Sequence, residues 1–237
     1  MKKIKVRPSD FAFKFDNCPR CWWMSLKGLS LKGDDLPAIF KHVDESMKSG
    51  ISIEVLNRLG IPAKEFVPMG FLLSQPIPFE HLGVELVISG RKDQVVRLAD
   101  GTLAPIDYKM TLPKTETVTK YARQLHGYLT AIENPATGEA HDVSALYLVC
   151  FNAYSGRFTV GASNGGEIPC AQKGTLVKLE VGIDRAGFTV QLEKIATIAA
   201  SDQPPEAGSG CALCHHIFDA LRHERDLAEG ANRKTNV

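Results

Sequence analysis

Two cysteine pairs of identical spacing lie near opposite ends of this 237-residue sequence. Each pair has the form Cys-x-x-Cys, and the four residues are Cys18, Cys21, Cys211 and Cys214. In an intracellular chain such pairs are typical of metal sites rather than disulfides. If all four thiolates bind one metal centre, the fold has to bring the two ends of the chain together. We therefore expect residues 9–30 and 201–228 to form one metal-binding lobe beside a core of residues 38–200.

The cysteine pattern is compatible with two kinds of metal centre. Four thiolates suit a structural zinc ion, and they equally suit a [4Fe–4S] cluster. The alternative is four unconnected thiols, and the matched spacing of the two pairs argues against it. In either metal-bound form, metal binding contributes to the free energy of folding.

The composition is that of a globular protein, with 44% hydrophobic residues. A chain of this length is enough for a single domain over residues 1–237. No apolar run approaches the roughly 18 residues needed to cross a membrane, and the basic N-terminus lacks the apolar stretch of a signal peptide. We therefore expect a cytoplasmic protein without a membrane partner. Because the net charge is only +1, nucleic-acid binding would need a local basic track.

Helix and strand patterns alternate along the middle of the chain. Apolar residues at three-to-four spacing predict a helix over 38–59, which Gly50 divides and which Gly60 and Pro62 end. A near-continuous apolar run over 144–152 predicts a strand buried on both faces. The other expected strands are 66–73, 84–89, 93–98, 103–108, 157–160 and 175–181. The other expected helices are 118–133, 184–200 and a last helix over 211–225. This alternation predicts an α/β fold in which helices flank a central mixed sheet of about four or five strands.

A short turn between two of these strands decides where three charged residues lie. Residues 99–101 (Ala-Asp-Gly) fit a three-residue hairpin loop with the glycine in the left-handed conformation. The register that follows sets Asp93 opposite Asp107, and Lys109 shares the face of Asp107 because it lies two residues further along. A two-residue turn would instead set Asp93 opposite Tyr108, on the wrong face. We expect the three-residue loop.

Two carboxylates that meet in this way are suited to binding a divalent cation. Without a cation they repel each other, and with Mg²⁺ or Mn²⁺ the repulsion becomes binding. Such an ion polarises a phosphate and activates a water molecule, while Lys109 is placed to stabilise developing negative charge. The alternative is a surface hairpin with scattered charges. Asp107 argues against it, because it follows the apolar residues 103–106 at the end of a buried strand.

A polar face on the helix expected over 118–133 comes next. Gln124 and Tyr128 lie four residues apart, so they share one side of that helix. Lys120 and Arg123 lie beside them. Such a face is suited to contact with a phosphate backbone. The alternative is an ordinary amphipathic helix whose polar side is solvated.

The order of these motifs resembles that of a known family. The segments are Gly90-x-x-Asp93, Asp107-Tyr108-Lys109 and Gln124-x-x-x-Tyr128, flanked by the two cysteine pairs. Together they resemble the RecB-like branch of the PD-(D/E)XK nucleases, and the cysteines resemble those of its iron–sulfur members, which include the CRISPR-adaptation exonucleases. The resemblance spans residues 9–220. The two-and-two division of the cysteines departs from the commoner one-and-three pattern of these members, so we expect a [4Fe–4S] cluster with zinc as the alternative.

The resemblance implies a role for each motif residue. Asp93 and Asp107 would be the ligands of Mg²⁺ or Mn²⁺, and Lys109 would be the catalytic lysine. Gln124 and Tyr128 would form the trailing motif that positions the lysine or the DNA.

The family also has an early metal ligand on its first core helix. In this sequence residues 41–45 (Lys-His-Val-Asp-Glu) offer the candidates. Sequences with two-plus-two cysteines resemble this one in a Val-Asp on that helix, so the preferred ligand is Asp44, with His42 second. Taken alone, a helical His or Asp is more often solvated than a ligand.

The function that the resemblance implies is metal-dependent hydrolysis of DNA phosphodiester bonds, as an exonuclease on single-stranded or end-containing DNA. The fold it implies is a restriction-endonuclease-like core, and its protein partners would belong to a repair, recombination or CRISPR-adaptation complex. Two other classes remain open: a catalytically silent nucleic-acid-binding or assembly subunit with the same fold, and a zinc-stapled interaction module that binds no DNA. The residues expected to form the basic DNA-binding track are Arg91, Lys92, Lys114, Lys120 and Arg123.

Overall fold

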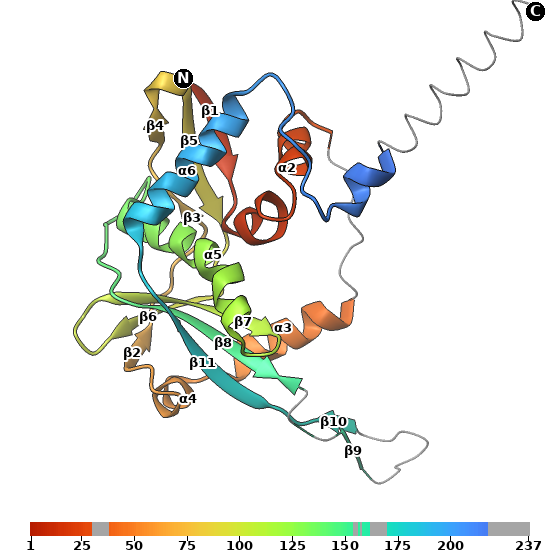
Figure 1. Ribbon diagram of the computed structural model, residues 1–237. Coiled ribbons are helices and arrows are strands. Elements are labelled where there is room, and N and C mark those ends of the chain that lie inside the picture. Colours follow the sequence, from red (N-terminus) through yellow and green to blue (C-terminus); the bar gives the residue numbers. More distant parts are fainter. Residues whose placement is uncertain (30–37, 154–155, 157, 162–169, 218–237) are drawn as a thin grey trace, which may run out of the picture.

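A five-stranded mixed sheet forms the centre of the fold in the computed structural model, which describes residues 1–29, 38–153, 156, 158–161 and 170–217 (Figure 1). The strands lie in the order β11-β8-β7-β6-β2. Their bounds are β2 Ala63–Phe66, β6 Gln94–Leu98, β7 Leu103–Met110, β8 Leu146–Asn152 and β11 Thr175–Val181. Strands β7 and β8 are parallel, and the other pairs are antiparallel. The expected α/β class with a central mixed sheet is confirmed.

Helix α5, Thr115–Glu133, connects the parallel strands β7 and β8. Parallel neighbours need such a crossover, because a short turn cannot return the chain to the same end of the sheet. The apolar side of α5, which includes Leu125 and Leu129, shares a buried cluster with Leu146 and Leu148 of β8. The helix therefore covers one face of the sheet (Figure 1).

A second buried cluster lies on the opposite face of the sheet. Ile106 and Tyr108, which alternate with Asp107 along β7, belong to it together with Leu56. Leu56 comes from α4, Ile53–Arg58, and α3, Ala38–Gly50, packs next to it through Met47. The predicted break of the 38–59 helix near Gly50 is confirmed, and Ser52 caps α4 by accepting a hydrogen bond of 3.3 Å from the Val55 N–H.

A smaller sheet is built around β5, Val84–Gly90. Its other strands are β1 Lys2–Val6, which runs parallel to β5, and β3 Leu72–Leu73 and β4 Ile77–Phe79, which run antiparallel to it. Strand β1 was not expected from the sequence, because three of its five residues are lysines. The expected strand over 66–73 is wrong, since β2 of the central sheet ends at Phe66 and the chain enters the smaller sheet only at Leu72. Pro68 and Gly70 lie in the interruption.

The connection between the two sheets carries the Gly-x-x-Asp motif. Strand β5 ends at Gly90 and β6 of the central sheet begins at Gln94, so Asp93 lies at the junction. A methyl group on Gly90 would lie 2.9 Å from Pro8 Cδ, which is closer than side chains normally approach. Glycine is therefore required at this position for the N-terminal segment to pack against the end of β5.

The described N- and C-terminal segments lie against each other (Figure 1). Helix α2, Pro19–Leu26, contacts the chain that follows α6, Arg185–Ala200. The Trp23 indole donates a hydrogen bond of 2.9 Å to the Ser201 carbonyl, and the Arg20 guanidinium donates one of 2.7 Å to the Pro205 carbonyl. These bonds hold the two ends together beside the cysteines.

The remaining elements are short. They are α1 Pro8–Asp10, the π-helix η1 Phe11–Phe15, the 3₁₀-helix η2 Glu80–Leu82, and strands β9 Phe158–Val160 and β10 Cys170–Gln172. Residues 212–217 are helical, so the part of the expected last helix beyond 217 lies outside the described residues. Within the described ranges, no helix combines the length and the apolarity that crossing a membrane requires.

Candidate active site and cysteine centre

The hairpin of β6 and β7 has the register that the sequence predicts. Gln94 pairs with Ile106, and the same register carried one residue further sets Asp93 beside Asp107. Gly101 in the turn has a φ of 92°, a left-handed conformation that favours glycine. The prediction of a three-residue loop is therefore confirmed.

Asp93 is held by two groups at the point where the hairpin ladder ends. Its Oδ2 accepts a hydrogen bond of 2.8 Å from the backbone N–H of Tyr108. Its Oδ1 lies 2.6 Å from the ammonium nitrogen of Lys48, which comes from α3. Asp93 is thereby fixed beside the residue that follows Asp107 in the chain.

Asp107 is almost completely buried, with 1% of its surface exposed. Its Oδ1 accepts a hydrogen bond of 2.9 Å from the Gln124 amide, and its Oδ2 lies 2.6 Å from the Lys109 ammonium. Burial raises the pKa of the Asp107 carboxyl to about 7, against the opposing effect of Lys109, and the nearby charge of Asp93 raises it further. The same ion pair raises the pKa of Lys109 in spite of its burial, so the lysine stays cationic.

Two buried atoms of this site lack a hydrogen-bond partner among the described residues. They are Asp107 Oδ2 and Gln124 Oε1. Asp107 Oδ2 has the Lys109 ammonium 2.6 Å away as its ion-pair partner, whereas Gln124 Oε1 has no partner of either kind among the described residues. Buried polar atoms are usually satisfied, so unsatisfied acceptors beside two carboxylates are suited to a ligand such as a cation or its water.

Helix α5 contributes polar side chains that contact the site. The Gln124 amide nitrogen, which bonds Asp107, also donates to the Tyr128 hydroxyl at 2.8 Å. Burial raises the pKa of Tyr128, so its hydroxyl stays protonated. One turn earlier, the Tyr121 ring centroid lies 4.9 Å from the Lys109 ammonium. The predicted face of the helix is thus directed at Asp107 and Lys109.

The described contacts at the site do not include the two ligand candidates that were predicted on α3, His42 and Asp44. His42 is exposed, and the side chain of Asp44 lies outside the described residues. The described contact from α3 is Lys48, one turn after Asp44, and the sequence did not single it out. A lone lysine on an amphipathic helix gives no signal for a site, because only the folded chain brings it to Asp93.

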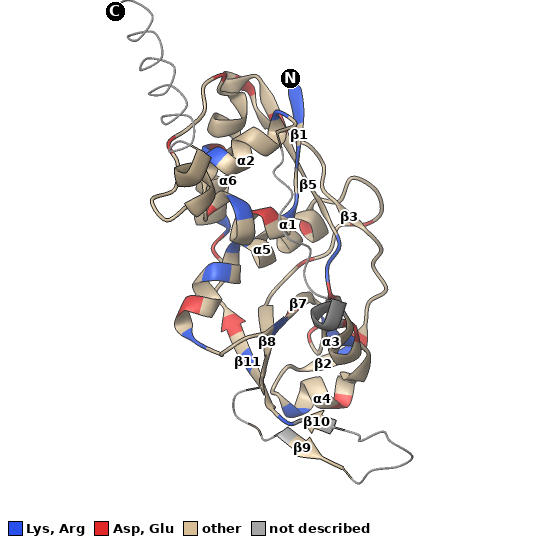
Figure 2. Cartoon of the chain, turned by 90° about the vertical axis from the view of Figure 1, so that its right-hand side faces the viewer, with Lys and Arg blue, Asp and Glu red and all other residues tan. Residues whose placement is uncertain are grey.

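The five residues predicted for a basic track have unequal surroundings. The Lys92 ammonium donates to the carbonyls of Met69 and Gly70, and burial lowers its pKa. Arg123 pairs with Asp16, whereas Lys120 lies over aromatic rings. Among the described residues the side chains of Arg91 and Lys114 make no ion pair and no hydrogen bond. Figure 2 shows basic and acidic residues interspersed along the chain.

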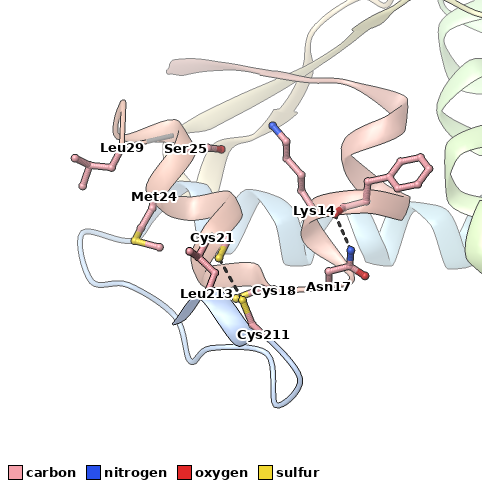
Figure 3. A pocket seen from close by; sticks show the side chains of 10 residues that line it. Lys14, Asn17, Cys18, Cys21, Met24, Ser25, Leu29, Cys211 and Leu213 are labelled. Atoms are coloured by element: carbon pink, nitrogen blue, oxygen red, sulfur yellow. Dashed lines mark hydrogen bonds between the residues drawn. The ribbon is translucent and has the colours of Figure 1, made fainter. Parts of the chain in front are cut away.

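The four cysteines converge, although almost two hundred residues separate the pairs. All four sulfur atoms lie within 4.8 Å of one another. The Cys21 sulfur is 3.5 Å from that of Cys211 (Figure 3). The Cys214 sulfur is 3.4 Å from that of Cys21 and 3.6 Å from that of Cys18. Disulfide bonding is excluded, because bonded sulfurs lie about 2.05 Å apart. The cluster is therefore suited to a metal.

The thiols of this cluster differ in acidity. Burial raises the pKa of the Cys21 thiol and raises that of Cys214 to about 11. For Cys18 burial acts in the same direction, but hydrogen bonds from the backbone N–H groups of Gly208 and Cys21 outweigh it and lower the pKa to about 6. The Cys18 thiolate is thus stabilised by the protein, whereas Cys21 and Cys214 need a cation to lose their protons.

Comparison with known proteins places this geometry in a family. The family described as the PD-(D/E)XK nuclease superfamily matches residues 51–217, which include the hairpin, α5 and the second cysteine pair. No protein of curated function matches the chain. A solved structure described as "Crystal structure of SSO0001" is 17% identical, with a TM-score of 0.41 over 84% of this chain and 78% of that chain. The family match covers well over half of the sequence, and the chain belongs to the PD-(D/E)XK nuclease superfamily.

Proposed function

We propose that this chain is a nuclease that hydrolyses DNA phosphodiester bonds with Mg²⁺ or Mn²⁺, acting on single-stranded or end-containing DNA. Membership of the superfamily implies metal-dependent nuclease chemistry. The observation that carries the proposal is the buried Asp107 carboxylate, held by Gln124 and paired with Lys109 beside Asp93. A carboxylate is costly to bury without compensation, so this arrangement needs a function to account for it.

The donor set fits a hard divalent cation. Mg²⁺ and Mn²⁺ prefer carboxylate oxygens, and Asp93 and Asp107 supply them side by side at the end of the hairpin. Asp44 is the proposed third ligand, with His42 second, because position 44 lies one helical turn before Lys48, which reaches Asp93. When bound, such an ion polarises the scissile phosphate and activates water.

The protein's own groups fix the geometry around that ion. The Tyr108 N–H orients Asp93, and the Gln124 amide orients Asp107. Tyr128 in turn accepts from Gln124 and fixes its rotamer. Lys109 remains cationic and is placed to stabilise the negative charge that develops on the phosphoryl group.

We further propose that the cysteine centre holds a single zinc ion rather than the [4Fe–4S] cluster implied by the family resemblance. Four thiolates placed tetrahedrally around zinc at about 2.3 Å stand about 3.8 Å apart. The nearest sulfur separations of 3.4–3.6 Å are close to that value. In a [4Fe–4S] cluster each thiolate binds a different iron, so the sulfurs stand further apart.

The visible absorption spectrum of the anaerobically purified protein tests the metal. Thiolate-bound zinc gives no visible absorption, and elemental analysis is expected to give one zinc per chain. A brown protein that contains iron and sulfide would overturn the zinc assignment. It would leave the nuclease proposal untouched, because the two centres are separate.

The test of the nuclease proposal is cleavage of labelled DNA by Asp107→Asn beside the wild type. The substitution keeps the shape of the side chain but removes a metal-binding charge worth several kcal/mol, so cleavage should fall about 100- to 1000-fold. The matched control is Asp100→Asn in the exposed turn of the same hairpin, which should cut at the wild-type rate. Equal cleavage by Asp107→Asn and wild type would refute the proposal.

A second candidate, a DNA-binding subunit without catalysis, is favoured by one observation. Both carboxylates already have a lysine partner, Lys48 on Asp93 and Lys109 on Asp107. If these ion pairs are permanent, a divalent cation cannot enter. This candidate predicts retention of DNA without cleavage in either Mg²⁺ or Mn²⁺.

A further inference from the structure

A half-exposed phenylalanine lies between the catalytic hairpin and the cysteine centre. Phe13 exposes 46% of its surface, although it packs edge to face on Tyr121 with ring centroids 5.8 Å apart. Tyr121 in turn lies under the Lys109 ammonium. Phe13 also lines a cavity of about 230 Å³ together with Cys21 and Cys211. Phe13 therefore links the two centres of the molecule.

The local backbone fixes this exposure. Phe13 lies in the π-helix η1, in which Phe11 and Phe15 on either side are buried. The Asn17 amide donates a hydrogen bond of 2.8 Å to the Phe13 carbonyl. The Arg123–Asp16 ion pair ties the end of this segment to α5. Phe13 is thus held outward by a fixed turn, and π-helical turns are frequent at functional sites.

Positive charge accompanies the ring. The Lys120 ammonium lies 5.1 Å from the Phe13 centroid and 5.5 Å from that of Tyr121. Among the described residues no carboxylate pairs with Lys120, whereas Lys14 at the cavity wall lies 3.4 Å from Asp10. Lys120 therefore keeps a charge that a phosphate group can use.

We propose that Phe13, backed by the buried Tyr121 and flanked by Lys120, is a stacking platform for an unpaired nucleobase, over which a single DNA strand runs between Lys109 and the cavity beside the cysteines. An exposed aromatic ring next to an unpaired cation is the combination that binds single strands without sequence preference. In a duplex the bases stack on one another and offer no free face to the ring. The inference rests on the proposed nuclease function, because the path of the strand is drawn from the proposed active site at the hairpin.

The charge and the continuity with Lys109 favour a nucleic-acid strand over a protein segment. Leu29 and Leu213 add apolar surface around the cavity, which a protein segment would also fit. An apolar protein segment, however, gains nothing from Lys120 and Lys109, the two cations at the Tyr121 ring on the way to Asp107. If the DNA-binding test described below fails, a protein segment becomes the favoured occupant of the apolar surface around the cavity.

The test measures binding of a labelled single-stranded oligodeoxynucleotide, and of its blunt duplex, at low salt without added divalent metal. Loss of one stacked base costs about 1–3 kcal/mol, so Phe13→Ala should weaken single-strand binding about 10- to 100-fold and leave duplex binding unchanged. Phe13→Trp should retain the wild-type affinity. A 2-aminopurine base in the oligonucleotide should lose fluorescence on binding to wild type but keep it with Phe13→Ala.

Two further variants sharpen this test. Lys120→Ala should lower the slope of log affinity against log salt by about 0.7, the value for one phosphate contact on a single strand. The matched control is Phe71→Ala, a phenylalanine with 62% of its surface exposed on the segment between β2 and β3, which should bind as wild type does.

The outcomes separate this inference from the proposed function. Wild-type single-strand affinity in Phe13→Ala, or an equal loss on single strand and duplex, would overturn the platform even if the wild type cuts DNA. Phe13-dependent quenching by a protein that cuts no DNA would support the platform and refute the nuclease proposal.

Discussion

Gln124 is the residue on which the geometry of Asp107 depends. Its amide nitrogen donates to the Asp107 carboxylate and to the Tyr128 hydroxyl, and all three groups are buried. A side chain that orients a metal-binding carboxylate has a measurable effect although it touches neither metal nor substrate.

We predict that Gln124→Ala lowers the affinity for Mg²⁺ about 10- to 100-fold, since the loss of such an orienting partner has that effect on metal sites. The free energy of unfolding of the metal-free protein should fall by about 1–3 kcal/mol, because a buried acceptor loses its donor. Calorimetric titration with Mg²⁺ and urea denaturation measure the two effects. A normal Mg²⁺ affinity in a destabilised variant would reduce Gln124 to a structural residue.

Lys48 occupies the position at Asp93 that a cation would take. We predict that Lys48→Met lowers the thermal stability of the metal-free protein, because Asp93 loses its counter-charge and Lys109 alone is left to offset the two carboxylates. Added Mg²⁺ should raise the melting temperature of this variant more than that of wild type. Lys194→Met on the exposed side of α6 serves as the control. Equal shifts in all three proteins would show that Lys48 does not compete with the metal.

At the scale of elements, the junction between the two sheets is the part that places Asp93. Gly90 at the end of β5 allows Pro8 to approach, and this packing anchors the N-terminal segment that carries Phe13 and the first cysteine pair. The motif glycine therefore serves packing, and the motif aspartate serves the site.

We predict that Gly90→Ala destabilises the protein by about 1–3 kcal/mol, the usual effect of overpacking a close contact. Gly70→Ala is the matched control, because a methyl group there would have no neighbour within 4 Å. Urea denaturation compares the two variants. Equal stability of the two variants would show that the close contact between Gly90 and Pro8 does not require glycine.

The hairpin could be predicted from the sequence because its determinants are local. A loop of three residues with Gly101 in the left-handed conformation fixes the register, and the register fixes which carboxylates meet. Strands β1 and β3 were not predictable in this way. They are short, and their partner β5 lies far from β1 in the chain, so only the tertiary fold selects them.

For the candidate site the same distinction holds. The motif residues Asp93, Asp107 and Lys109 could be placed from spacing alone, since one hairpin carries them. Lys48 and Tyr121 reach the site from other elements, and no local pattern marks them. The convergence of the cysteines was inferred from their matched spacing, but the distances between the sulfurs needed the structure.

At the scale of the whole molecule, the cysteine centre closes a very long loop. Cys18 and Cys214 are 196 residues apart in the chain and 3.6 Å apart in space. A link of this kind restricts the unfolded chain far more than the folded one.

We predict that Cys214→Ser lowers the free energy of unfolding by about 5 kcal/mol, the order expected for a cross-link that closes so long a loop. Urea denaturation of the metal-loaded proteins checks this, and a midpoint unchanged by Cys214→Ser would mean that no metal is held there.

The π-helix η1 has a consequence for how this chain tolerates changes of length. A π-turn contains one residue more than the α-helical turn it replaces. Deletion of a single codon within Phe11–Phe15 would restore ordinary helical phase and rotate everything on the N-terminal or C-terminal side of it by about 100°. Phe13 would swing away from Tyr121, and Cys18 and Cys21 would no longer face their partners. We expect this short stretch to tolerate no insertion or deletion.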